Sequence, residues 1–116
     1  MTRFLDGPAA GAQLLLRRAP LFLRVTQNPR GRFDALDQVA DDPQADETIS
    51  VYQRVTAPTS FHVDGYRRKE GRIAEWFQGA DYRAVAPTPD ERILRNRELW
   101  QLWCRQRKAQ EEASPS

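Results

Sequence analysis

This chain has little of what most catalytic and metal sites are built from. Its 116 residues include one cysteine, Cys104, and one histidine, His62. A single cysteine excludes an internal disulfide, and a lone Cys with a lone, distant His lacks the ligand spacing of a zinc site. No glycine-rich loop followed by Lys and Ser or Thr is present, so nothing indicates a phosphate-binding loop. We therefore predict no metal and no cofactor.

Long apolar runs are missing as well. No run approaches the roughly 20 residues that a membrane-spanning helix needs, and residues 1–8 lack the basic, apolar and small-residue order of a signal peptide. Hydrophobic residues make up 40% of the chain and charged residues 29%, which is typical of a soluble globular protein. We expect a soluble cytoplasmic protein that does not bind membranes.

The same scarcity argues against catalysis, because an active site needs several convergent ionisable groups. His62 lies in a strand-like segment, where a structural or surface role is the usual one. Cys104 falls on the apolar side of a predicted helix, where a small core side chain is the default. Acidic residues combined with tyrosine or arginine leave an unconventional site open. We predict that the chain is not an enzyme and assign no catalytic residue.

Charge is present but unevenly distributed. The net charge is +2, which by itself does not indicate nucleic-acid binding. Residues 1–33 carry a balance of +5, whereas residues 34–50 carry −6. The acidic stretch lacks the alternate ligand spacing of a calcium-binding loop. Its simplest interpretation is a solvated loop, and a docking surface for a basic partner is the alternative.

Short alternating segments dominate the first three quarters of the chain. Residues 21–27 alternate, with Leu23 on one face and Arg24 on the other, and the turn at residues 28–31 leads into a second extended segment, which together predict a hairpin. Asp64-Gly65 is typical of a tight turn. The charged run at residues 67–72 indicates a hairpin tip or a second turn. Further strands are expected at residues 48–55, 61–63, 73–77 and 82–85.

A helix is signalled near the C-terminus. Thr88 at the N-cap, Pro89 at the first helical position and Glu91 form a capping box, so we expect one helix over residues 88–110 and a disordered tail over 111–116. Trp100 and Trp103 lie on its apolar face and are expected to be buried. The predicted fold is a single α+β domain over residues 1–110, with an antiparallel sheet or partly open small barrel (1–87) covered by that helix.

Two surfaces are candidates for partner binding. On the helix, Leu94 and Leu102 fall outside the apolar face, next to Arg95 and Arg105. At the expected tip, Arg67, Arg68 and Arg72 precede an aromatic pair, so basic groups could hold phosphates while rings stack on bases. A charged hairpin tip followed by a core strand is the simpler interpretation of the second surface.

The short stretches at residues 3–11, 18–25, 34–38 and 79–83 resemble parts of small uncharacterised accessory proteins of tailed phages that infect GC-rich bacteria. The resemblance implies a phage protein acting in the cytoplasm of its bacterial host. We expect a protein-binding module that docks on and modulates a host or virion protein. A nucleic-acid-binding protein using Arg67–Arg72, a virion structural component and a homo-oligomer are the alternatives, and the oligomeric state is left open.

Overall fold

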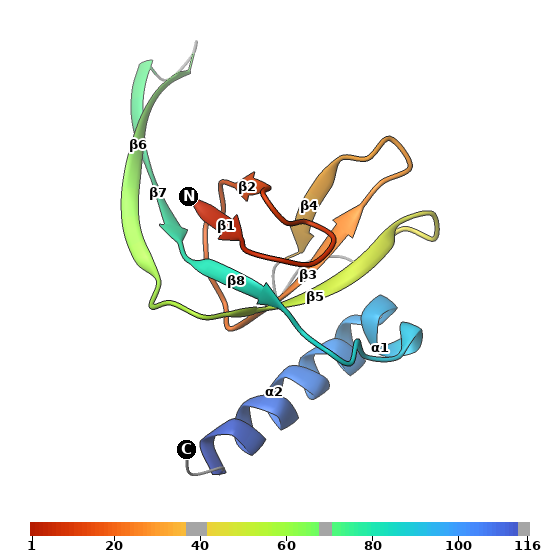
Figure 1. Cartoon of the computed structure of the whole chain (residues 1–116). Helices are drawn as coiled ribbons and strands as arrows, with labels where there is room; N and C mark the ends of the chain where they lie inside the picture. Colours follow the sequence, from red (N-terminus) through yellow and green to blue (C-terminus); the bar gives the residue numbers. More distant parts are fainter. Residues whose placement is uncertain (37–41, 68–70, 114–116) are drawn as a thin grey trace.

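A computed structural model describes the backbone of residues 1–36, 42–67 and 71–113, and their side chains except those of residues 66, 67 and 72–74. Its centre is a mixed six-stranded sheet, nearly closed into a barrel, in the order β2-β1-β8-β5-β3-β4 (Figure 1). These strands are β1 (Thr2–Phe4), β2 (Gln13–Leu14), β3 (Phe22–Gln27), β4 (Phe33–Leu36), β5 (Thr48–Arg54) and β8 (Asp81–Ala84). The expected α+β class is therefore confirmed.

One pair of strands departs from the expected antiparallel sheet. β1 runs parallel to β8, with Arg3 opposite Asp81 and Phe4 opposite Tyr82. The side chains of Arg3 and Asp81 tie the pair together through a two-pronged contact, Nε to Oδ1 at 2.9 Å and Nη2 to Oδ2 at 3.0 Å. This parallel pairing joins the first and last strands of the strand-rich part of the chain. Local turn signals predict antiparallel hairpins, so they cannot predict such a pairing.

The predicted hairpin is confirmed by the antiparallel pairing of β3 with β4. Its turn is held by Asn28, whose side-chain oxygen accepts hydrogen bonds from the backbone N–H groups of Arg30 at 3.0 Å and Arg32 at 2.9 Å. Gly31 has a φ of 84°, a left-handed conformation that glycine adopts without steric cost. The turn chemistry of the sequence thus sets the register of this hairpin.

The sheet has a core on each of its faces. Inside the barrel lie Phe4, Leu23, Val25, Tyr52 and Tyr82, all buried. The outer face carries a second cluster that is covered by the C-terminal helices; it consists of Phe22, Ile49, Val51, Leu94 and Trp100. Alternation along β3 supplies both clusters, because neighbouring side chains point to opposite faces of a strand.

The barrel interior is closed at one end by the turn after β1. The Tyr52 hydroxyl accepts a hydrogen bond from the Ala9 N–H and donates one to the Asp6 carbonyl, both at 2.8 Å. Gly7 has a φ of 71°, and a Cβ added there would lie 2.8 Å from the Tyr52 hydroxyl oxygen. Glycine is therefore required at this position by both its backbone conformation and the close approach of Tyr52.

The C-terminal helix differs from the expected one in its start, its continuity and its end. Helix α1 spans Glu91–Arg95 and is capped by Asp90, not Thr88, because the Asp90 side chain accepts a hydrogen bond from the Arg92 N–H at 2.7 Å. Asn96 is extended (φ −120°, ψ 122°) and separates α1 from helix α2, which spans Arg97–Ala113. Residues 111–113, expected in the tail, are helical, and the Gln53 side chain donates to Glu111 at 2.7 Å.

The remaining strands form a two-stranded ribbon, called the arm below. β6 (Thr59–Arg67) pairs antiparallel with β7 (Gly71–Gly79) over nine positions. The expected tight turn at Asp64-Gly65 is wrong, because both residues lie inside β6, opposite Ala74 and Ile73. The long ladder outweighs this local turn signal. From β7 the chain passes through Ala80 directly into β8, so the arm extends from the barrel as a continuation of one of its strands (Figure 1).

Candidate functional site

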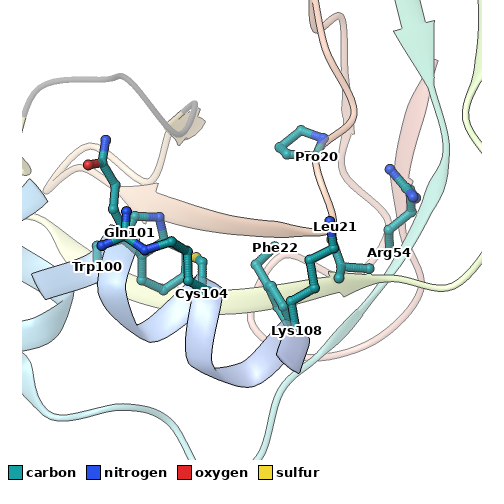
Figure 2. A pocket seen from close by; sticks show the side chains of 9 residues that line it. Pro20, Leu21, Phe22, Arg54, Trp100, Gln101, Cys104 and Lys108 are labelled. Atoms are coloured by element: carbon teal, nitrogen blue, oxygen red, sulfur yellow. The ribbon is translucent and has the colours of Figure 1, made fainter. Parts of the chain in front are cut away.

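A groove of about 590 Å³ lies between α2, the start of β3 and the end of β5 (Figure 2). The segment from Pro20 to Phe22 forms one side, and Trp100, Gln101 and Cys104 form the other. These residues meet because β3 places Phe22 on the outer face of the sheet, where α2 covers it. The tandem tryptophans of the sequence anchor this contact. Trp100 is fully buried and stacks on Trp103 with ring centroids 5.1 Å apart.

The tryptophans behave largely as the sequence predicts. Trp100 is a core anchor, as expected, whereas Trp103 is half-buried and packs edge-on against Phe22 at 5.1 Å. Burial of the Cys104 thiol raises its pKa to about 12. The thiol is therefore neutral at physiological pH, and a neutral thiol is a weak nucleophile.

Three cationic side chains surround the groove: Arg54 from β5, and Arg105 and Lys108 from α2. Arg54 is oriented by a hydrogen bond from its Nη1 to the Ala19 carbonyl at 2.5 Å. Arg105 and Lys108 are exposed and lie three residues apart, so they occupy the same side of the helix. No carboxylate belongs to the groove lining among the residues that the structure describes.

A fourth cation, Arg24, lies behind the groove in the contact between sheet and helix. It is fully buried, its Nη1 donates to the Leu94 carbonyl at 2.8 Å, and its guanidinium carbon lies 5.4 Å from the centre of a Trp100 ring. Its Nε and Nη2, like the Trp100 indole nitrogen, have no hydrogen-bond partner within the described ranges. Burial lowers the Arg24 pKa, yet an arginine stays charged at neutral pH.

Sequence reasoning missed Arg24 as a buried cation. The alternation of residues 21–27 places Arg24 on the same face as Phe22, and the structure shows that α1 and α2 cover this face. Phe22 at the preceding position of the same face was the available signal. It indicates that both faces of β3 are buried, as in the centre of a covered sheet.

Two of the expected partner-binding residues are occupied within the chain. Leu94 is 1% exposed and packs in the outer core, because the break at Asn96 rotates α1 relative to the continuous helix that was assumed. Arg95 donates to Glu91 at 2.8 Å and to the carbonyls of Gln44 and Glu47 at 2.7 and 2.9 Å. Leu94 is therefore inaccessible to a partner in this structure, whereas Arg95, whose side chain is partly exposed, holds the segment before β5 against α1.

The other helix residues remain accessible. Leu102 is 42% exposed and Leu99 is 41% exposed, so α2 carries a small apolar patch that faces away from the sheet. Arg105 is exposed and lines the groove. Leu102 and Arg105 lie three residues apart and are neighbours on α2, but only Arg105 lines the groove.

Positions 67 and 72, two of the basic positions predicted at the tip, lie at the outer end of the described part of the arm. Arg68 and the side chains of Arg67 and Arg72 lie outside the described residues. In the backbone register Arg67 is opposite Gly71, and Tyr66 is opposite Arg72. Positions 67 and 72 are thus brought close to each other by strand pairing.

The arm exposes a large aromatic side chain that the sequence analysis had linked to the basic tip. Trp76 is 63% exposed and lies against His62 across the ladder, with ring centroids 5.1 Å apart. Phe77 points to the opposite face, where it is buried and covered by Arg17, whose guanidinium carbon lies 4.7 Å from the ring centre. One face of the arm is therefore anchored to the barrel, and the other presents Trp76 to solvent.

The structure does not combine the two residues considered for catalysis. His62 belongs to the arm, is half exposed and lies 3.7 Å from an Asp64 oxygen, whereas Cys104 lines the groove on α2. Within the described ranges no three His, Cys, Asp or Glu side chains gather as a metal site would require. Neither helix, as far as it is described, has the length and hydropathy of a membrane span.

No protein-family model, curated protein or solved structure matches this chain. The functional interpretation therefore depends on the groove, the arm and the sequence.

Proposed function

We propose that this protein is a non-enzymatic, phage-encoded binding module that docks through its arm on a host or virion protein in the bacterial cytoplasm. The observation that carries the proposal is the exposure of Trp76, 63% of whose surface meets solvent on a ribbon with no covering strand or helix among the described residues over that face. Tryptophan is the residue most enriched at the energetic centres of protein interfaces.

The arm is built in a way that suits docking. Its base is fixed, because the Gln78 side chain accepts from the Ala19 N–H at 2.9 Å and Arg17 pairs with Glu75 at 3.1 Å. Next to these contacts the ribbon exposes Trp76 on one face and Val63 on the other. An isolated two-stranded ribbon is only marginally stable in water, so a partner that covers it would bury apolar surface and stabilise it.

A non-enzymatic role is supported by the chemistry of the candidate groups. The Cys104 thiol is protonated because burial raises its pKa to about 12. His62 contacts Trp76 and Asp64 on an open surface, without the enclosed site in which general acid–base catalysis normally operates.

Nucleic-acid binding is the second candidate, favoured by one specific observation. Trp76 is an exposed ring on the same ribbon whose outer end carries positions 67 and 72, both arginine. Aromatic stacking combined with phosphate contacts is the usual chemistry of single-strand binding, and such binding weakens steeply with salt. If the arginines at the tip are only solvated, the protein should not retain nucleic acid at physiological salt.

The two candidates are separated by capture from bacterial lysate with and without nuclease. The bait is the tagged full chain, and the test variant carries Val63→Ser and Trp76→Ser. Leu99→Ser with Leu102→Ser is the matched control, because it also removes two exposed apolar side chains, but on α2. We expect one protein to be retained after nuclease treatment by wild type and control, and to be lost by the arm variant.

Other outcomes decide against docking through the arm. If the captured protein is lost after nuclease treatment and is captured again when single-stranded DNA is added, the tagged chain binds nucleic acid and not the protein itself. If the arm variant captures the same protein as wild type while the α2 variant does not, the docking surface is the helix.

A further inference from the structure

The groove beside α2 has a charge pattern that the proposed docking of the arm does not use. Arg54, Arg105 and Lys108 surround it, and no described carboxylate lines it. The groove belongs to the barrel and α2, so an inference about it does not depend on what the arm binds. Cations placed together repel one another, and a counter-charge between them relieves that repulsion.

Buried charge strengthens the same field. Arg24 is completely inaccessible to solvent and lies against Trp100, which forms part of the groove wall. Two of its three guanidinium nitrogens have no acceptor within the described part of the chain. The Asp42 carboxylate offsets part of the Arg24 charge, but a buried cation is poorly screened, so the remaining potential reaches neighbouring sites more strongly than that of an exposed cation.

Apart from Gln101, the rest of the groove wall is apolar. The partly exposed Leu21 contributes aliphatic surface from the sheet side, and the partly exposed, neutral Cys104 thiol lies opposite it on α2, while the buried Phe22 and Trp100 rings lie directly behind this wall (Figure 2). A volume of about 590 Å³ is in the range of sites that hold small molecules. An apolar wall bordered by cations favours a ligand that has an apolar body and a negatively charged group.

We propose that the groove is a binding site for a small amphipathic organic anion, an aromatic or aliphatic body bearing a carboxylate or sulfonate. Its apolar body lies between Leu21 and the Cys104 side of α2, in front of the buried Phe22 and Trp100 rings, and its anionic group lies among Arg54, Arg105 and Lys108. Both parts are needed, because the apolar contact supplies affinity and the cations select against neutral analogues.

The probe for the test is 8-anilinonaphthalene-1-sulfonate, an aromatic anion whose fluorescence rises in an apolar site. N-phenyl-1-naphthylamine, which has nearly the same rings without the sulfonate, is the neutral comparison. We expect the full chain to bind the anion saturably with one site, and the neutral probe at least about tenfold more weakly. Equal binding of both probes would overturn the proposal.

Charge reversal locates the site. In Arg105→Glu with Lys108→Glu, we expect the dissociation constant of the anionic probe to rise about tenfold or more. Arg30→Glu with Arg32→Glu is the matched control, because it changes the net charge equally at the exposed turn after β3 and should leave the affinity unchanged. An equal loss in both variants would show only a response to net charge, which contradicts a built site.

A measurement on the unchanged protein covers the case in which the charge-reversed variant fails to fold. Amide ¹H–¹⁵N spectra titrated with the anionic probe should shift the signals of Leu21, Gln101 and Arg105. Shifts confined to the arm, or spread evenly over the surface, would overturn the assignment of the site.

Discussion

The barrel with its helices and the arm are stabilised in different ways. In the barrel, β3 and β5 each pair with a neighbour on both sides, and both faces of the sheet are covered by buried side chains. In the arm, two longer strands pair only with each other among the described residues, and Trp76 remains exposed. The longest strands of the molecule are therefore the least covered ones.

This difference shows that strand length and stability are separate properties. Hydrogen-bond ladders contribute little net free energy unless apolar surface is buried with them. The arm buries Phe77 against the barrel and leaves Val63 and Trp76 exposed, so we expect its stability to be local and low. Such an element gains most from a partner that covers it, which is why we assign docking to the arm and folding to the barrel.

The largest expected effect comes from removing the helix anchor. Trp100→Ala deletes a fully buried ring that packs on Trp103 and on the outer core, and we expect a loss of about 3–5 kcal/mol in the free energy of unfolding. Urea unfolding followed by circular dichroism measures it. A loss below about 1 kcal/mol would mean that α2 is not part of the cooperative unit.

A smaller effect is expected at the closed end of the barrel. Tyr52→Phe keeps the ring but removes the hydroxyl that bonds the Ala9 N–H and the Asp6 carbonyl. Leaving these two groups unpaired costs about 1–3 kcal/mol, and the same unfolding experiment detects it. Phe4, which packs edge-on against this ring at 4.8 Å, should keep its environment. An unchanged stability would show that water replaces both bonds.

A pH-dependent effect is expected at the parallel pair of strands. Hydrogen bonds from Arg3 lower the pKa of Asp81. The folded state therefore binds a proton less readily than the unfolded one, so the stabilisation is present at neutral pH and is lost as the pH falls below about 4. Asp81→Asn should remove it. We expect the difference in unfolding midpoint between wild type and variant to narrow on acidification; a difference independent of pH would contradict this.

The smallest effect on stability is expected on the arm. Trp76→Ala removes a ring that is 63% exposed, so the free energy of unfolding should change by no more than about 0.5 kcal/mol. Compared with Trp100→Ala, it tests the same residue type in the two regions. A loss as large as that of Trp100→Ala would show that the arm belongs to the core, and the division proposed above would fail.

The sequence predicted those parts of the fold that depend on local signals. The β3–β4 hairpin follows from alternation and from the turn at Asn28, and the buried Trp100 follows from helical spacing. The break at Asn96 was not predicted, because the apolar spacing continues across it and only the packing of Leu94 under the sheet shows the change of direction. The parallel pairing of β1 with β8 joins segments far apart in sequence, where turn chemistry gives no information.

The candidate sites show the same limit. Arg105 was predicted as a partner-binding residue because it lies next to Leu102, outside the helix's apolar face, but its companion at the groove, Arg54, comes from a strand on the other side. Only the folded chain brings these cations together. The exposure of Trp76 was likewise not predictable, because an alternating apolar segment is typical of a core strand as much as of a free ribbon.

The most direct test of the account is photocrosslinking from single positions during capture from nuclease-treated lysate. Benzoylphenylalanine replaces Trp76 in one sample and Leu102 in another, so that the arm and α2 are each probed at an exposed apolar position. Docking through the arm predicts a crosslinked partner from position 76 and none from position 102. A crosslink from position 102 with none from position 76 would contradict it.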